Sequence, residues 1–154
     1  MDTTKEYLSK DKYNELTEEL ELLLHVKRKE IAEALEAAKA LGDLSENAEY
    51  HSAREAQAGV EERIMIVEEI LKNAVIVGHK HKTDVVDIGS VVTLKRGKDT
   101  KVYTIVGSEE NNVLEGKISN KSPLGEGMMG KRKDDQFTFI TQKGEESCQI
   151  LEIK

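Results

Sequence analysis

Apolar residues recur every three or four positions through two long stretches in the first half of the chain. The first stretch runs from about Asp11 to Leu41, with a polar interruption at residues 27–30 beyond which the apolar face is slightly rotated. The second runs from about Glu46 to Ala74, and its apolar residues alternate in steps of four and three, as in a coiled coil. These residues are Val60, Ile64, Val67, Leu71 and Ala74. The pattern predicts two long helices.

A short polar link joins the two predicted helices. Gly42 stands where a residue in the left-handed conformation ends a helix, and Asp43 stands where a side-chain oxygen caps the next one. Helices joined by so short a link run antiparallel and side by side. At 1.5 Å per residue, each would be roughly 45 Å long. We therefore expect a helical hairpin whose narrow, alanine-lined tip carries acidic residues.

Short stretches of alternating apolar and polar residues replace the helical pattern in the second half of the chain. Turns at residues 97–99 and 143–144 each separate two such stretches, which predicts two β-hairpins. The four predicted strands are Ser90–Leu94, Lys101–Val106, Gln136–Thr141 and Ser147–Ile153. Between the hairpins, Ser122 and Pro123 are typical of the N-cap and first residue of a short helix. A small sheet with one covering helix places the fold in the α+β class.

Charge and glycine content change together near residue 77. Residues 1–77 carry 10 Lys and Arg against 18 Asp and Glu, a balance of −8, whereas residues 78–154 carry 13 against 12, a balance of +1. Nine of the eleven glycines and the only proline lie in the second part. We therefore expect two domains, a coiled-coil hairpin over residues 1–77 and a globular domain over residues 78–154. A polar connector at residues 79–82 would follow the boundary.

Composition narrows the classes of function. With 38% hydrophobic residues and no tryptophan, the chain suits extended helices better than one compact core. Its single cysteine, Cys148, excludes an intrachain disulfide and is typical of a reducing cytoplasm. No stretch has the length and hydropathy of a signal peptide or a membrane span, so we expect no membrane partner. A net charge of −7 argues against broad, non-specific nucleic-acid binding.

Asp43 and Glu46 are the candidate metal ligands. Three residues apart at the start of a helix, their side chains would share one face beside the positive end of the helix dipole, which favours ionisation. Ionised oxygens suit Mg²⁺, but two carboxylates supply only part of the six ligands that it prefers. The pair could complete a site that another molecule half provides. Because Asp-x-x-Glu is also close to a capping box, local chemistry leaves both interpretations open.

The tip sequence GDLSENAEYHSARE, from Gly42 to Glu55, closely resembles the hairpin tip of bacterial Gre transcript cleavage factors. The resemblance continues at Val75–Val77, around Ile118–Ser119 and Ser122–Gly125, and from Gly130 to Asp135. It covers most of the chain, including its length and domain order. The acidic hairpin is more similar to the GreA members than to the more basic GreB members. The resemblance implies an FKBP-like fold for the C-terminal domain.

The resemblance also implies a function. In this family the hairpin enters the secondary channel of a backtracked bacterial RNA polymerase and stimulates Mg²⁺-dependent cleavage of the 3′ end of the nascent RNA, which rescues arrested complexes. The chain would not be an enzyme by itself and would bind no cofactor alone. Asp43 and Glu46 match the tip acids that share a Mg²⁺ ion with the polymerase active centre, in agreement with the half-site inferred from the residues. We expect a cytoplasmic monomer.

Further residues near the tip match the family pattern. The resemblance implies that Arg54 contacts the extruded RNA, although by residue type Arg54 could equally pair with a nearby glutamate. Lys39, on the facing helix, would add to this basic spot as a second RNA-contacting residue. Tip support would come from Gly42, Leu44, Asn47 and Tyr50. For Tyr50 we favour packing against the first helix over stacking on RNA. His51 is assigned no role, because a metal ion makes a general base unnecessary.

A loop of the C-terminal domain is the expected polymerase-binding element. In this family it grips a coiled coil at the rim of the channel. The corresponding residues are Asn120, Lys121, Ser122 and Pro123. Related proteins often carry an acid just before the Ser-Pro pair, where this chain has Asn-Lys, so the polar half of the contact differs from the family pattern.

Two other functions remain open. A Gre-like inhibitor would plug the polymerase channel and slow nucleotide addition without shortening RNA, although inhibitory relatives depart from the Asp-x-x-Glu tip that this chain keeps. A helical-hairpin chaperone would hold client proteins along its apolar seam, although we expect that seam to be buried between the helices. Suppression of client aggregation that survives loss of both tip acids would favour the chaperone.

Overall fold

The computed structural model describes residues 4–78 and 83–154, which form two compact units. One is the helical hairpin, Tyr13–Asn73, and the other is a globular unit that combines the chain up to Lys12 with the chain from Ala74 onward. The α+β class is confirmed. The expected domain boundary at residue 77 differs from this division, because the segments on both sides of the hairpin pack with the globular unit. The expected polar connector at residues 79–82, with His79 and His81, lies outside the described residues.

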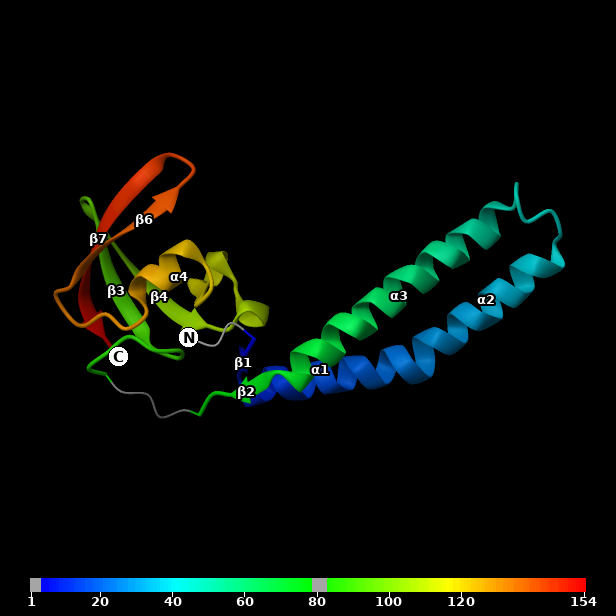
Figure 1. The fold of residues 1–154 in the computed structure, drawn as a ribbon, viewed down its shortest axis with the longest axis horizontal. Helices are drawn as coiled ribbons and strands as arrows, with labels where there is room; N and C mark the ends of the chain where they lie inside the picture. The colour runs from blue at the N-terminus through cyan, green and yellow to red at the C-terminus, as the bar shows by residue number, and fades with distance from the viewer. Residues whose placement is uncertain (1–3, 79–82) are drawn as a thin grey trace. The chain divides into compact units, whose positions relative to one another are not determined.

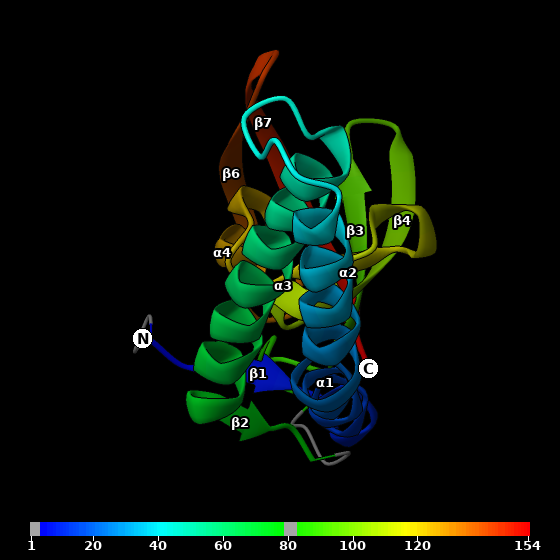
Figure 2. The same ribbon diagram turned by 90° about the vertical axis from the view of Figure 1, so that its right-hand side faces the viewer.

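The hairpin consists of an interrupted helix and a continuous helix, joined by a short link (Figure 1). The interrupted helix contains α1 (Lys10–Leu22), a π-helical turn η1 (Leu23–Lys27) and α2 (Arg28–Ala40). The continuous helix is α3 (Ala48–Lys72). Figure 2 shows α2 and α3 lying side by side. No helix among the described residues has the length and hydropathy needed to cross a membrane.

A narrow apolar seam and two ion pairs hold the helices together. The buried residues of the hairpin are Leu16, Ala38, Ala53, Ile64, Val67 and Ile70. Ile70 is more buried than Leu71, which the heptad pattern placed in the seam. Arg28 contacts Glu61 through two hydrogen bonds of 2.7 Å, and Arg63 contacts Glu19 through two of 2.6 and 2.9 Å. Both pairs are bidentate, which fixes the guanidinium plane as well as the charge.

The π-helical turn lies just before and within the polar interruption of the apolar pattern. A π turn holds one more residue than an α turn, so it shifts every later side chain around the helix axis. The rotated apolar face that the sequence predicts beyond residue 30 has this physical cause.

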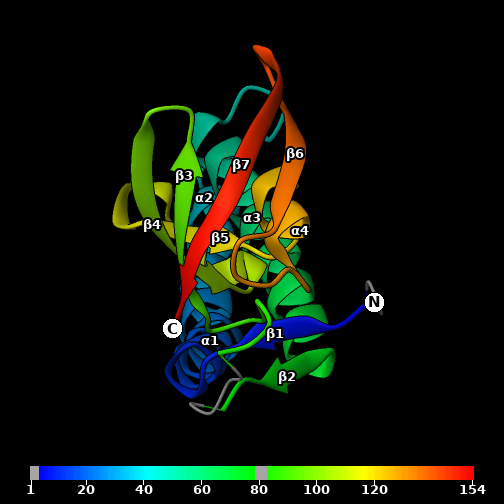
Figure 3. The ribbon, with the colours of Figure 1, turned by 90° about the vertical axis from the view of Figure 1, so that its left-hand side faces the viewer.

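The globular unit contains a five-stranded sheet with the strand order β5-β4-β3-β7-β6 (Figure 3). The strands are β3 (Val91–Arg96), β4 (Asp99–Val106), β5 (Lys117–Ser119), β6 (Gln136–Thr141) and β7 (Gly144–Ile153). The antiparallel pairs β3–β4 and β6–β7 confirm both predicted hairpins. The sequence did not predict β5, which pairs with β4 in parallel after the 3₁₀ helices η2 (Ser108–Glu110) and η3 (Val113–Glu115).

One face of the sheet packs with the short helix α4 (Pro123–Met128) to form the core. Side chains alternate between core and surface along the strands, so Val92 and Leu94 of β3 are fully buried. Met128 of α4 is also fully buried against this face. The helix begins as predicted, with Ser122 as its N-cap and Pro123 at its first turn.

A small parallel sheet of β1 (Glu6–Leu8) and β2 (Ala74–Ile76) belongs to the same unit. A β-carbon added to Gly107 would lie 1.7 Å from the carbonyl oxygen of Tyr7, so β1 packs directly against this glycine. The carboxylate of Glu110 accepts hydrogen bonds from the Ser9 backbone and hydroxyl, at 3.0 and 2.6 Å. The Ser9 hydroxyl in turn caps α1 by accepting from the Lys12 amide at 3.1 Å.

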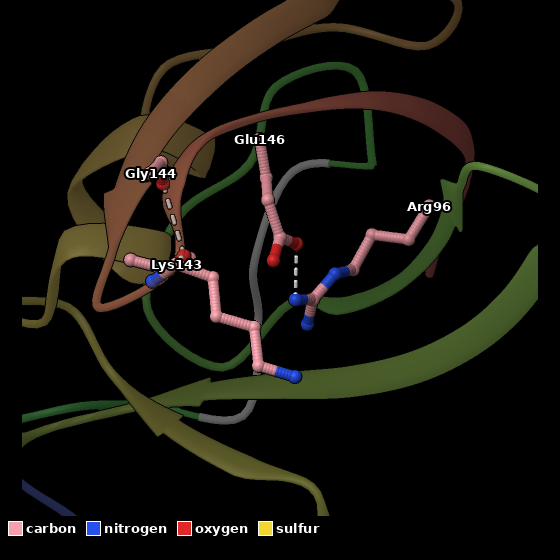
Figure 4. Close-up of polar contacts among 5 residues, drawn as sticks. Arg96, Lys143, Gly144 and Glu146 are labelled. Carbon is pink, nitrogen blue, oxygen red and sulfur yellow. Dashed lines mark hydrogen bonds and ion pairs between the residues drawn. The ribbon is translucent and has the colours of Figure 1, made fainter.

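Beyond the core, the same face of the sheet carries an ion pair between Arg96 of β3 and Glu146 of β7 (Figure 4). The guanidinium carbon of Arg96 lies 5.4 Å from the ring centroid of Phe139, within reach of a cation–π contact. The hydrogen bond to Glu146 raises the pKa of Arg96. Cys148, opposite Arg96 in the ladder, is 2% exposed, and burial raises the pKa of its thiol.

Candidate functional site

The link between α2 and α3 is a helix end followed by a β-turn. Gly42 has a φ of +78°, which confirms that it ends the first helix in the left-handed conformation. The next four residues, Asp43–Glu46, form a turn closed by the Glu46 amide, which donates to the Asp43 carbonyl at 3.3 Å. Asp43 also has a positive φ, of +43°. This conformation is uncommon outside glycine and is tolerated best by Asp and Asn.

The prediction that Asp43 caps the second helix is wrong. The N-cap of α3 is Asn47, whose side-chain oxygen accepts a hydrogen bond from the Tyr50 amide at 3.0 Å. Asp43 and Glu46 therefore do not share a helical face, and the capping-box interpretation does not apply to them. Their proximity comes instead from the β-turn, which brings its first and fourth α-carbons within about 7 Å of each other.

Asn47 also ties the turn to the end of the first helix. Its amide nitrogen donates to the carbonyls of Ala38, at 2.7 Å, and Gly42, at 3.2 Å. These carbonyls belong to the last turn of α2 and its C-terminal end, and that of Ala38 also accepts from the Leu41 amide at 3.2 Å. One side chain thus satisfies an orphan donor of α3 and adds a donor to two carbonyls at the end of α2.

Two further hydrogen bonds order the turn itself. The Ser45 hydroxyl donates to the Asp43 carboxylate at 3.0 Å. The imidazole Nε2 of His51, in the first turn of α3, lies 3.2 Å from the Ser45 carbonyl oxygen. Since a carbonyl only accepts, Nε2 is the protonated nitrogen in this contact. The sequence interpretation assigned no role to His51, and no local sequence pattern signals this contact.

Both candidate metal ligands are exposed to solvent. Their oxygens are hard donors of the kind that Mg²⁺ accepts. Among residues 4–78 and 83–154, no group of three or more His, Cys, Asp and Glu side chains converges on a point that could hold a metal ion. Within these residues, Asp43 and Glu46 therefore have no third ligand of these types beside them. Two carboxylates supply only part of the six ligands that Mg²⁺ prefers.

The other predicted tip residues lie in the turn or on the helices that flank it. Leu44 is 41% exposed at the outer corner of the turn. Tyr50 is half-buried, and its ring makes an edge contact with His51, with centroids 5.7 Å apart. Arg54, one helical turn further along α3, is exposed and bonds Gln57 at 3.0 Å rather than the glutamate considered from the sequence. Lys39 is exposed near the end of α2.

The predicted polymerase-binding loop contains both buried and exposed residues. Asn120 is 3% exposed, and its side-chain oxygen has no hydrogen-bond partner among the described residues. Lys121 pairs with Glu6 of β1 at 2.6 Å. The Ser122 hydroxyl donates to the Ser119 carbonyl at 2.7 Å and caps α4, whereas Pro123 is exposed. The side chain of Asn120 is therefore inside the loop, whereas those of Lys121 and Pro123 are on its surface.

Comparison with known proteins places both halves of the chain. The family model described as "Transcription elongation factor, N-terminal" matches residues 6–76, and the model described as "Transcription elongation factor, GreA/GreB, C-term" matches residues 80–154. The chain is 43% identical to the transcription elongation factor GreA of Geobacillus kaustophilus, over the full length of both proteins. It is 45% identical to the GreA of Clostridioides difficile, covering 100% of this chain and 99% of that one.

A solved structure gives a more distant similarity. GreA factor homolog 1 of Thermus thermophilus is 29% identical and matches over 97% of this chain and 99% of that chain, with a TM-score of 0.43. Two family models that together span nearly the whole chain, and relatives above 40% identity over its full length, agree on one assignment. The chain belongs to the GreA/GreB family of transcription elongation factors.

Proposed function

We propose that the chain enters the secondary channel of a backtracked bacterial RNA polymerase and stimulates cleavage of the 3′ end of the nascent RNA. It would not hydrolyse RNA alone, and it would lend the carboxylates of Asp43 and Glu46 to the active centre of the polymerase. The observation that carries this proposal is the exposure of both carboxylates on one β-turn at the end of the hairpin. Family membership supports the same function.

The proposed chemistry is hydrolysis of one phosphodiester bond. A water molecule attacks the phosphorus, the bond from phosphorus to the 3′ oxygen breaks, and the shortened RNA keeps a free 3′ hydroxyl. A Mg²⁺ ion shared between the tip and the polymerase would activate that water and stabilise the developing charge. The task of Asp43 and Glu46 is to present their oxygens in one direction, and the turn and the Ser45 hydrogen bond support that task.

Two cationic side chains extend the proposal to the RNA. Arg54 and Lys39 are exposed on α3 and α2, within a few residues of the helix ends that flank the turn. Cations in these positions would pair with phosphates of the extruded strand. The Arg54 bond to Gln57 is intrahelical and exposed, so it can be exchanged for a phosphate contact at little cost.

In the globular unit, the loop at residues 120–123 would bind the coiled coil at the rim of the channel. The contact would fall to Lys121 and Pro123, because both are exposed. Asn120 and Ser122 would shape the loop from inside through the Ser122 cap and the buried Asn120 side chain.

RNA shortening in halted bacterial polymerase complexes with Mg²⁺ tests the proposal directly. Asp43→Asn and Glu46→Gln keep the size of each side chain and remove one charge. We expect each to lower cleavage at least a hundredfold while polymerase binding, measured in parallel by competition with the wild-type protein, changes less than threefold. Glu49→Gln is the matched control, because Glu49 is an exposed acid in the first helical turn of α3 and lies just outside the β-turn.

Two outcomes would overturn the proposal. Cleavage that persists in Asp43→Asn would remove the metal role of the tip. Slower nucleotide addition without any RNA shortening by the wild-type protein would instead indicate an inhibitor that occupies the channel.

A further inference from the structure

The peptide that joins Ser45 to Glu46 is held from both of its edges. On one edge, its N–H donates to the Asp43 carbonyl at 3.3 Å and closes the turn. On the other edge, its carbonyl oxygen, which belongs to Ser45, lies 3.2 Å from Nε2 of His51. Because a peptide is planar, two hydrogen bonds on opposite edges fix the orientation of the whole plane. The α-carbon of Glu46 lies in that plane, so the point from which its side chain starts is fixed with it.

His51 is itself well anchored. Its backbone amide donates to the Asn47 carbonyl at 3.1 Å, which is an early intrahelical bond of α3. Its ring meets the ring of Tyr50 edge-on, with an angle of 64° between the planes, and Tyr50 is half-buried. The imidazole is therefore held by the rigid helix and reaches back across the N-cap to the turn.

We propose that His51 is a positioning residue, which orients Glu46 for ion binding by holding the Ser45 carbonyl. This role rests on the proposed function and deepens it. It requires a donor at Nε2, which the neutral Nε2–H tautomer and the imidazolium both supply. The role is therefore distinct from that of a general base, which would need a free lone pair on the reacting nitrogen.

The distinction between a positioning residue and a general base predicts which variants at position 51 keep cleavage. His51→Gln keeps an N–H donor on a side chain of similar reach, whereas His51→Leu keeps apolar bulk and has no donor. We expect His51→Leu to lower the maximal cleavage rate about threefold to tenfold, the range expected for one net hydrogen bond. His51→Gln should recover most of that loss, and half-maximal factor concentration should stay within twofold for both variants.

A second measurement needs neither the polymerase nor a metal ion. In the free protein, NMR hydrogen exchange at the Glu46 amide reports whether the turn is closed, and the ring nitrogen shifts report whether Nε2 carries the proton. We expect the Glu46 amide to exchange at least threefold faster in His51→Leu than in the wild type, with Gln close to the wild type. Amides in the middle of α3 should be unchanged, which shows that the helix remains folded.

The outcomes separate the inference from the proposed function. If Asp43→Asn abolishes cleavage but His51→Leu changes neither cleavage nor Glu46 exchange, the positioning role is wrong and the metal role stands. If Gln and Leu at position 51 lose cleavage equally while Gln keeps the slow exchange, His51 acts by chemistry and not by positioning. If Asp43→Asn retains cleavage, the proposed function fails whatever happens at position 51, while the exchange result still reports on the turn.

Discussion

A methyl group placed on Gly107 would lie 1.7 Å from the carbonyl oxygen of Tyr7 and 2.8 Å from its carbonyl carbon. Both contacts are with backbone, which cannot rotate away as the end of a side chain can. Gly107 precedes η2, and Tyr7 is the middle residue of β1, so the absence of a side chain at position 107 is what lets the N-terminal strand pack within the globular unit.

We therefore expect Gly107→Ala to displace β1 and to destabilise the globular unit by about 2 kcal/mol or more. Hydrogen exchange at the Val77 amide checks this, because that amide donates to the Leu8 carbonyl at 2.8 Å and is released when β1 moves. Gly59→Ala is the matched control. Gly59 lies inside α3 with no atom within 4 Å of an added β-carbon, so alanine there should stabilise the hairpin by about 1 kcal/mol.

Asn47 caps α3 and also bonds two carbonyls at the end of α2, and two substitutions separate these roles. Asn47→Asp keeps the acceptor for the Tyr50 amide and removes the donors to Ala38 and Gly42, whereas Asn47→Ala removes both. We expect the alanine variant to fray the start of α3 at a loss of about 1 kcal/mol in hairpin stability. The aspartate variant should keep the helix start and loosen only the turn. Amide exchange at Tyr50 and Glu46 measures the two effects separately.

The Arg28–Glu61 pair predicts a pH dependence that can be measured at one carboxyl group. The hydrogen bond from Arg28 lowers the pKa of Glu61 below its usual value of about 4.5. Because the folded pKa is the lower one, the pair stabilises the hairpin above that usual value and loses its effect as the pH falls through the folded pKa. NMR titration of Glu61 should show the lowered pKa. Arg28→Met should return it to its usual value, and 1 M salt should reduce the shift, since the pair is exposed.

Cys148 should be almost inert in the folded protein. Burial raises the pKa of its thiol, and only the thiolate is reactive. Because the chain has a single cysteine, reaction with a coloured thiol reagent reports on this position alone. We expect labelling at pH 8 to proceed at the opening rate of the sheet and to become fast in urea. Fast labelling of the native protein would contradict the burial of Cys148 against the core.

The long helices and the longer strands could be predicted from periodicity, whereas the backbone conformation of the tip and its capping residue could not. The steps of Val60, Ile64 and Val67 indicate a helix because each lies on the buried side, and the alternation in β3 and β6 indicates strands for the same reason. Asp43 was misplaced as a cap because its left-handed backbone is invisible in the sequence. Asn47 is an equally good capping residue four positions later, and only the backbone decides between the two.

Short parallel pairs also lie beyond sequence patterns. The strands β1 and β2 have three residues each and are separated by the whole hairpin, so no local alternation or turn signals their pairing. β5 also has only three residues, and no local alternation or turn signals its parallel pairing with β4. The resemblance at the tip identified Asp43 and Glu46 together, but the helical spacing argument that first placed them side by side does not hold, since a β-turn performs that task.

The π-helical turn at Leu23–Lys27 has a consequence for how the hairpin tolerates changes in length. Each residue of an α-helix advances about 100° around the axis, so the extra residue of the π turn acts as a phase correction between the two halves of the first helix. Deleting one residue there would return the backbone to a regular α-helix. It would leave Ile31, Leu35 and Ala38 close to their present angular position relative to Leu16 and Leu20, because the loss of one residue and the return to α-helical twist cancel. The irregular turn thus accommodates one extra residue and still keeps the far end of the hairpin facing its partner.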